Sequence, residues 1–296
     1  MYPRLINSLL LHRISRFRGV VLTGARQVGK TFVLKELVKD QGGVYMSFDD
    51  PLILREAQRD PLGWIRRVRK PGELFIIDEA VKCPEIFSAV KVVIDYEDPT
   101  PSKIILASSG NYLLVRKIKE SLAGRVALLS LYPLSWREAL GSKLVRDSSN
   151  LSLLFSPDKL IKIERKRLVS DLERERTAFL LSGGFPEIWN NISSYSFRNQ
   201  WAKSYFMSYL LPLASTLFTI SKQDVFARLF EHISLLTSQL LNYSNIARKC
   251  GVSSPTVKSY LHYLNAMEVI KEVPQFFKNP RKRLVKMQKI YVLDPI

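Results

Sequence analysis

The hydrophobic positions of this chain form short runs that alternate with segments whose apolar residues recur every three to four positions. Short apolar or alternating runs are typical of strands, and the longer spacing is typical of helices. The predicted strands are residues 19–23, 44–48, 73–79, 103–109 and 126–131. The predicted helices are residues 4–16, 32–38, 52–68 and 85–95. Alternating strands and helices form parallel sheets covered on both faces, so the first half of the chain is predicted to be an α/β core.

The second half of the chain follows a helical pattern. It contains a mixed-charge helix over 162–176, a break at Gly183-Gly184-Phe185-Pro186, and a long apolar-periodic helix over 197–218 that is interrupted at Pro212. The polar stretch that precedes the mixed-charge helix indicates a change of domain. The predicted division is a core over 1–138, a helical lid or linker over 139–218 and a C-terminal domain over 219–296.

The C-terminal segment has the pattern helix, glycine-containing turn, helix. Ser254 is a candidate N-cap, and Pro255 suits the first position of the second helix. The residues spaced to form a small helix-turn-helix core are Ala247, Val252, Val257 and Leu261. Residues 269–273 and 289–293 then resemble the two strands of a wing, so the segment is predicted to be a winged helix. The alternative is a helical protein-interaction module that binds no nucleic acid.

The loop between the first predicted strand and the next helix matches a phosphate-binding pattern. It fits G-x-x-x-x-G-K-[ST] at every fixed position: Gly24-Ala25-Arg26-Gln27-Val28-Gly29-Lys30-Thr31. Backbone N–H groups of such a loop close around a polyphosphate, and the helix N-terminus adds its positive dipole end. Lys30 would reach the β- and γ-phosphates, and the Thr31 hydroxyl would ligate Mg²⁺. The flanking strand and helix favour this prediction of bound ATP over a chance match.

Two carboxylates end the third predicted strand. Asp78 and Glu79 follow a buried apolar run about fifty residues after the phosphate loop. Because ligands bind at the carboxyl ends of parallel strands, we expect Asp78 to hold the Mg²⁺ that Thr31 also ligates. Glu79 would accept a proton from the water that attacks the γ-phosphate. The alternative is a pair of solvated acids at a strand end.

Polar residues around the later strands supply further candidates. Ser109 and Asn111 follow a predicted strand, where they would sense the γ-phosphate or orient water. Alternatively, this Ser-Ser-Gly-Asn cluster only forms a turn. Arg125 is a candidate arginine finger, supplied in cis or by a neighbouring subunit of a homo-oligomer, and the alternative is a surface arginine.

Composition adds a polyanionic partner to this interpretation. The formal net charge is +18 and the pI is about 9.9, which indicates nucleic acid or an anionic membrane face, unless the source organism is generally rich in lysine. The two cysteines, Cys83 and Cys250, match no metal spacing and fit a reducing, cytoplasmic location. No apolar run approaches the length of about 18 residues that indicates a membrane span.

Duplex DNA is the partner predicted from the helix-turn-helix. Thr256 and Lys258 would face a major groove. The loop between the wing strands would contact phosphates through its basic side chains, among them Arg281, Lys282, Arg283 and Lys286. A single lysine near the start of the second helix provides little for reading bases.

Taken together, these motifs resemble the bacterial and archaeal AAA-type ATPases whose P-loop core, called AAA_14, is joined to a C-terminal region known as DUF4143. The residues that carry the resemblance are the phosphate loop with Leu22-Thr23 before it, Ser47-Phe48-Asp49-Asp50-Pro51, Ile76-Ile77-Asp78-Glu79, Pro84-Glu85, Ser121-Leu122-Ala123-Gly124-Arg125-Val126, Leu131-Tyr132-Pro133-Leu134-Ser135, Gly183-Gly184-Phe185-Pro186-Glu187 and Asn279-Pro280-Arg281-Lys282-Arg283-Leu284-Val285-Lys286. The resemblance implies a AAA+ type core, a helical lid and a winged-helix piece.

The chain departs from that family at several positions. Ala80-Val81 replaces the Ile and Gln usual after the acidic pair, Ala107-Ser108-Ser109 replaces Thr-Gly-Ser, and Leu211-Pro212 stands where an Arg-Asp pair is usual. The sequence also ends at Asp294-Pro295-Ile296, where family members usually continue into a nuclease-like region. The resemblance therefore implies ATP binding more firmly than hydrolysis, and a truncated or decayed copy is one interpretation.

These features predict a Mg²⁺-dependent ATPase that converts ATP to ADP and phosphate. Its nucleotide cycle would control a basic winged-helix module that holds DNA. The alternative is a nucleotide-gated DNA- or protein-binding switch with little or no hydrolysis. The altered sensor region favours that alternative, and Glu79 opposes it. The winged-helix tail disfavours a third hypothesis, a small-molecule P-loop kinase.

Overall fold

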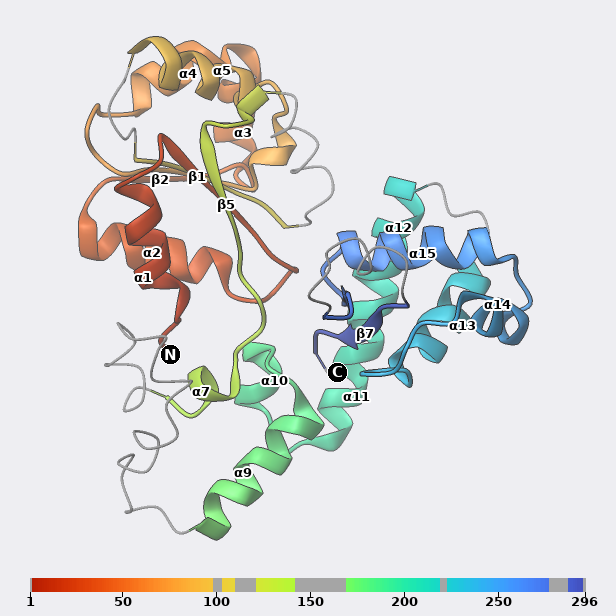
Figure 1. Ribbon diagram of the computed structural model, residues 1–296. Coiled ribbons are helices and arrows are strands. Elements are labelled where there is room, and N and C mark those ends of the chain that lie inside the picture. The colour runs from red at the N-terminus through yellow and green to blue at the C-terminus, as the bar shows by residue number, and fades with distance from the viewer. Residues whose placement is uncertain are drawn as a thin grey trace. The chain divides into compact units, whose positions relative to one another are not determined.

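The computed structural model describes residues 2–97, 103–109, 121–141, 169–218, 223–276 and 287–294. The chain divides into two compact units (Figure 1). Unit 1 comprises Met1–Arg176 with Gly184–Pro186, and unit 2 comprises Thr177–Gly183 with Glu187–Ile296. The three-part division at residues 138 and 218 stays a prediction.

Unit 1 is built on a five-stranded sheet in which every neighbouring pair of strands is parallel. The strands are β1 (Gly19–Thr23), β2 (Val44–Ser47), β3 (Phe75–Asp78), β4 (Ile104–Ala107) and β5 (Val126–Ser130). Their order is β2-β3-β4-β1-β5, so β4 lies between the strand that precedes the phosphate loop and the strand that ends in Asp78. The predicted α/β core with a parallel sheet is confirmed.

Helices cover both faces of this sheet (Figure 1). Helices α1 (Ile6–Ile14) and α2 (Lys30–Gln41) lie on one face, and α3 (Pro51–Arg59), α4 (Pro61–Val68) and α5 (Ile86–Val92) lie on the other. A π-helical segment, η2 (Val93–Glu97), continues α5, and a short helix, α7 (Trp136–Ala139), follows β5. Buried aromatic side chains of α4, β3 and α5, namely Trp64, Phe75 and Phe87, belong to one core cluster. This packing fixes the strand ends that carry the candidate site.

The helix predicted over residues 52–68 is divided into α3 and α4. Pro61 begins α4, where its missing N–H costs no helical hydrogen bond. The preceding Asp60 ends α3 and caps α4, because its carboxylate accepts a hydrogen bond from the Gly63 N–H at 2.9 Å. The apolar periodicity runs across this joint, so periodicity alone predicted one helix.

Unit 2 is largely helical. Helix α9 (Val169–Ser182) crosses the division between the units, and it is followed by α10 (Pro186–Asn190), α11 (Tyr195–Tyr205), the π-helical segment η5 (Phe206–Leu210) and α12 (Leu211–Phe218). The predicted interruption near Pro212 takes the form of η5, which ends directly before α12. A π segment is a known way to accommodate a break in the helical hydrogen-bond ladder.

The C-terminal part of unit 2 contains α13 (Gln223–Ser234), α14 (Tyr243–Cys250), α15 (Ser254–Ala266) and an antiparallel pair, β6 (Ile270–Val273) and β7 (Lys289–Val292). Gly251 ends α14 in the left-handed conformation, with φ of 67°. The N-cap of α15 is Ser253 rather than Ser254, since the Ser253 hydroxyl accepts from the Thr256 N–H. Ala247, Val257 and Leu261 belong to one buried cluster. Within the described ranges, no helix has the length and apolar character needed to cross the membrane.

Candidate functional site

The phosphate loop joins β1 to α2, and the backbone requires glycine at both of its glycine positions. A Cβ at Gly24 would lie 2.4 Å from the carbonyl oxygen of Leu131, too close for any side chain. Gly29 has φ of 98° and is the N-cap of α2. The loop therefore presents backbone N–H groups at a helix N-terminus, the arrangement that binds phosphate.

Lys30 places its ammonium group inside this loop. Its side chain is buried, and Nζ donates to the carbonyl oxygens of Gly24 at 2.9 Å and Ala25 at 2.8 Å. These contacts fold the side chain back over the loop instead of extending it into solvent. A positive charge is thereby held where the phosphates of a nucleotide would lie.

Arg4 supports the phosphate loop through a hydrogen bond to its backbone, a role that the sequence analysis did not predict. Its buried guanidinium donates to the carbonyl oxygens of Val28, at 2.6 Å, and Tyr132, and it pairs with Glu138 at 3.0 Å. Glu138 is also buried and forms a capping box with Ser135 at the start of α7. The S-x-x-E spacing was a sequence signal for that box, but no local pattern pointed to Arg4.

Arg4→Ala is expected to destabilise the chain by about 3–5 kcal/mol, because it leaves the buried Glu138 carboxylate without its cation. The free energy of unfolding from denaturant titration measures this. Arg67→Ala is the control, since Arg67 forms an exposed ion pair with Asp60 and its removal should change stability by less than about 0.5 kcal/mol. Equal losses of unfolding free energy in the two variants would contradict this structural role of Arg4.

The carboxylate of Asp78 is buried at the end of β3 and accepts three hydrogen bonds. Its Oδ2 accepts from the hydroxyls of Thr31 at 2.7 Å and Tyr45 at 2.8 Å, and its Oδ1 accepts from the backbone N–H of Glu79 at 3.0 Å. Burial, and then the charge of Asp78, raise the pKa of Tyr45, so Tyr45 is a donor at neutral pH. Sequence reasoning paired Asp78 with Thr31 but missed Tyr45.

The Thr31–Asp78 pair fits a magnesium ion. Because the Thr31 hydroxyl donates its proton to Asp78, the oxygen keeps its lone pairs for a metal. Among the described residues, no group of three or more His, Cys, Asp and Glu side chains could hold a metal ion. A hydroxyl paired with a carboxylate suits Mg²⁺, which is commonly held by few protein ligands together with substrate phosphates.

Glu79 lies beside the Thr31–Asp78 pair in a left-handed backbone conformation, with φ of 52°. Its Oε1 accepts from the Ser109 hydroxyl at 2.6 Å, and its Oε2 accepts from the Ser109 N–H at 3.2 Å and the Ser108 hydroxyl at 3.3 Å. These contacts exist because β4, which ends just before Ser108, is the neighbour of β3 in the sheet. A left-handed non-glycine residue stores strain of about 1–3 kcal/mol and is typical of functional sites.

Arg125 lies at the amino ends of the strands, whereas the phosphate loop lies at their carboxyl ends. It directly precedes Val126, which pairs with Gly19 at the amino end of β1, whereas the loop follows Thr23. The ends of such a strand are about 13 Å apart or more. Arg125 also donates to both carboxylate oxygens of Asp95, at 2.8 and 3.0 Å, and this lowers the pKa of Asp95. The interpretation of Arg125 as a finger in cis is therefore wrong, and its supply to a neighbouring copy stays a prediction.

Several predicted site residues lie outside the described part of the chain: Asn111, Arg281, Lys282, Arg283 and Lys286. Of the predicted DNA contacts, Thr256 and Lys258 are described. The Thr256 hydroxyl lies 2.8 Å from that of Ser253, and the Lys258 ammonium lies over the Tyr243 ring, 5.2 Å from its centre. Lys258 is exposed, whereas Thr256 is partly buried at the start of α15.

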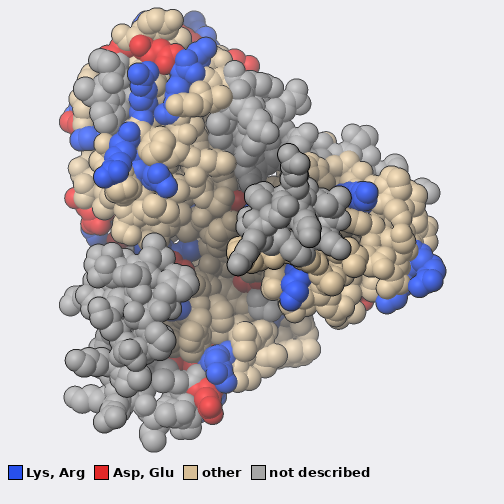
Figure 2. Space-filling view, viewed as in Figure 1, with Lys and Arg blue, Asp and Glu red and all other residues tan. Residues whose placement is uncertain are grey.

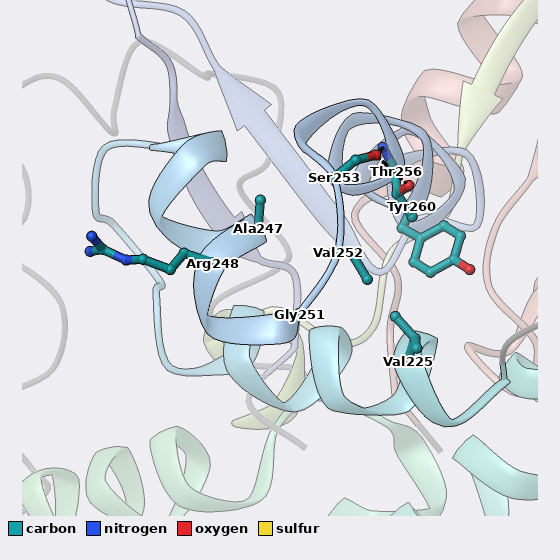
Figure 3. A pocket seen from close by; sticks show the side chains of 8 residues that line it. All are labelled: Val225, Ala247, Arg248, Gly251, Val252, Ser253, Thr256 and Tyr260. Atoms are coloured by element: carbon teal, nitrogen blue, oxygen red, sulfur yellow. Dashed lines mark hydrogen bonds between the residues drawn. The ribbon is translucent and has the colours of Figure 1, made fainter.

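A hollow of about 640 Å³ adjoins the turn between α14 and α15 (Figure 3). Its lining residues are Val225, Ala247, Arg248, Gly251, Val252, Ser253, Thr256 and Tyr260. In Figure 3 the Arg248 side chain points away from Ser253 and Thr256, so the charged group is not directed at the polar side of the hollow. Figure 2 shows basic side chains over α4 and α5 of unit 1 as well as near α14. Among the described residues on this face, therefore, basic side chains are not confined to the C-terminal module.

Comparisons with known proteins agree with this geometry. Residues 16–140 match the family model AAA_14, described as an AAA domain. The region for which the resemblance named DUF4143 matches instead a model described as a domain of unknown function, DUF8612, over residues 173–295.

Two curated proteins and a solved structure are similar to this chain over nearly its whole length. The chain is 26% identical over 287 residues to the uncharacterized proteins Mb2031c of Mycobacterium bovis and Rv2008c of Mycobacterium tuberculosis; the match covers 96% of this chain and 56% of each relative. The chain thus spans about half the length of these curated relatives. A solved Walker-type ATPase of Pyrococcus abyssi, paby2304, aligns with a TM-score of 0.51 at 18% identity, covering 100% of this chain and 94% of the other, which shows a shared fold. The N-terminal core, residues 16–140, is therefore an AAA domain of the AAA_14 type.

Proposed function

We propose that the chain binds ATP together with Mg²⁺ at the phosphate loop and hydrolyses it to ADP and phosphate. The observation that carries the proposal is the convergence of charged and hydroxyl side chains at the carboxyl ends of β1, β4 and β3. Lys30 lies in the loop, the Thr31 hydroxyl is bonded to Asp78, and Glu79 adjoins that pair. Phosphate release from ATP by the purified chain, with and without duplex DNA, tests the proposal.

The proposed reaction is an in-line attack of water on the γ-phosphorus. The bond between that phosphorus and the β–γ bridging oxygen breaks, ADP leaves, and Glu79 accepts the proton lost by the water. Lys30 and the loop N–H groups stabilise charge on the phosphate oxygens. Mg²⁺, when held by Thr31 and Asp78, neutralises further phosphate charge. If the chain assembles as a homo-oligomer, Arg125 of a neighbouring copy is the candidate finger.

A nucleotide-gated switch with little hydrolysis is the second candidate, and the contacts of Glu79 favour it. Both oxygens of its carboxylate are engaged by Ser108 and Ser109. These three hydrogen bonds restrict the carboxylate, which would have to reach the attacking water through the lone-pair site left on Oε1. If phosphate release does not exceed that of Glu79→Gln while ATP still binds, the switch is the better description.

We also propose that α13–α15 with β6 and β7 form a winged helix that binds duplex DNA. The proposal is supported by the glycine turn between α14 and α15, by the antiparallel strand pair after α15, and by the exposed Lys258. The segment between β6 and β7 contains Lys278, Arg281, Lys282, Arg283 and Lys286 and no acidic residue. Such a segment suits contacts to phosphates rather than to bases.

If the segment between β6 and β7 contacts DNA phosphates, the affinity for duplex DNA should fall steeply as salt rises. Each neutralised phosphate contributes a slope of about −0.9 in log K against log [salt]. Replacing Arg281, Lys282 and Arg283 together with alanine should therefore reduce the magnitude of the slope by about 2 to 3. Fluorescence anisotropy across a salt series measures both values.

The control for this series is the pair Arg66→Ala and Arg67→Ala in unit 1. Both side chains are exposed on α4, so removing them changes the net charge of the chain without touching the C-terminal module. If the salt dependence of DNA affinity falls as much in the control as in the triple variant, the phosphate contacts do not belong to the segment between β6 and β7. Affinity that does not change with salt would rule out phosphate contacts altogether.

A further inference from the structure

Tyr45 connects the edge strand β2 to the carboxylate assigned to the metal. Strand β2 pairs with β3 in parallel, and Tyr45 stands two residues before Ser47, the partner of Asp78 in the register. Two residues of a strand span about 6.6 Å, a distance that a tyrosine side chain can cover. The hydroxyl accordingly reaches Asp78 Oδ2, at 2.8 Å.

The Tyr45 side chain is held from the helix side as well. The Lys35 ammonium, one turn along α2 from Thr31, lies over the aromatic ring at 5.3 Å from its centre. The same helix therefore supplies Thr31, which donates to Asp78 Oδ2, and Lys35, which holds Tyr45. Tyr45 is thus held by a hydrogen bond to Asp78 and by a contact to the helix that carries Thr31.

We propose that Tyr45 is a positioning residue of the metal site, which fixes the Asp78 carboxylate and favours Mg²⁺ over Ca²⁺. The inference rests on the proposed function. A carboxylate oxygen offers two lone-pair sites, and the hydroxyls of Thr31 and Tyr45 occupy both sites on Oδ2. A cation that bonded Oδ2 directly would have to displace one hydroxyl. Mg²⁺ tends to keep its waters, whereas Ca²⁺ readily takes several carboxylate oxygens, so the arrangement penalises Ca²⁺ more.

The test is calorimetric binding of a non-hydrolysable ATP analogue to the full chain in EDTA, in Mg²⁺ and in Ca²⁺. In Tyr45→Phe, we expect the affinity for the analogue in EDTA to stay within twofold of the wild type. The factor by which Mg²⁺ increases that affinity should fall about tenfold. The factor by which Ca²⁺ increases the affinity should fall less. The variant should therefore discriminate less between Mg²⁺ and Ca²⁺ than the wild type does. Tyr96→Phe is the matched control, since Tyr96 belongs to the same unit and is 82% exposed.

A double-mutant cycle separates positioning from general structural support. In an Asp78→Asn background, Tyr45→Phe should have no further effect on the Mg²⁺ gain. An equal loss of affinity in EDTA and in Mg²⁺, or a full Mg²⁺ gain in Tyr45→Phe, would overturn the inference while leaving ATP binding intact. If the wild type fails to bind the analogue in Mg²⁺, the proposed function fails, and the inference fails with it. Thermal unfolding without ligand verifies that each variant is folded.

Discussion

Lys30→Ala is expected to weaken ATP binding about a hundredfold, because it removes the ammonium group that the phosphate loop holds at its centre. Truncating one partner of a buried, hydrogen-bonded charge pair costs about 2–5 kcal/mol, and a hundredfold loss is about 2.7 kcal/mol. The buried position of the Lys30 side chain places it in this range rather than among surface charges. Equilibrium binding of a fluorescent ATP analogue measures the effect.

The control is Lys39→Ala, which removes a lysine from the exposed face of the same helix. This variant should bind the analogue as the wild type does. Because the Lys30 ammonium also bonds the carbonyl oxygens of Gly24 and Ala25, the thermal stability of both variants should be recorded without nucleotide. An affinity within threefold of the wild type in a folded Lys30→Ala protein would refute the assignment of the loop.

Glu79→Gln is expected to lower the rate of phosphate release by about 10²- to 10⁴-fold, the range that a general base contributes. The amide keeps nearly the same shape but cannot accept the proton of the attacking water. ATP binding should remain within a fewfold of the wild type, since Lys30, Thr31 and Asp78 are unchanged. Steady-state phosphate release at saturating ATP, together with analogue binding, distinguishes catalysis from affinity.

The matched control is Glu73→Gln, close to β3 at its other end and exposed to solvent beside Lys70. It removes the same charge without approaching the loop and should leave the rate unchanged. Equal rates in the wild type and in Glu79→Gln, with binding intact in both, would favour the nucleotide-gated switch. A rate that falls equally in Glu73→Gln would instead indicate a general effect of charge.

The phosphate loop shows how much the sequence could provide for this site. Eight consecutive residues specify it, and the flanking run of apolar residues specifies a buried strand, so loop, strand and helix were predicted at their observed places. Asp78 could be predicted for the same reason, since it ends an apolar run. The joint at Asp60-Pro61 was also present in the sequence, but the apolar periodicity across it concealed the break between α3 and α4.

The proposed winged helix and its proposed DNA contacts illustrate a different limit. Helices α14 and α15 and the pair β6–β7 were predicted close to their observed bounds, because turn residues and apolar spacing are local signals. Whether this module binds DNA depends on the charge of its surface and on partners. The salt dependence of the affinity for duplex DNA is therefore the measurement that tests DNA binding by this module.

The sequence by itself determined the phosphate loop, the acidic pair and the alternation of strands and helices, since each is specified by residues that are adjacent in the chain. Only the tertiary structure decided which side chains meet at the site. The placement of β4 beside β3 brings Ser109 to Glu79, and the pairing of β2 with β3 brings Tyr45 to Asp78. The pairing of β5 with β1 places Arg125 at the amino ends of the strands, whereas the loop lies at their carboxyl ends. Strand order depends on pairing between distant segments, and local hydrophobic periodicity carries no information about it.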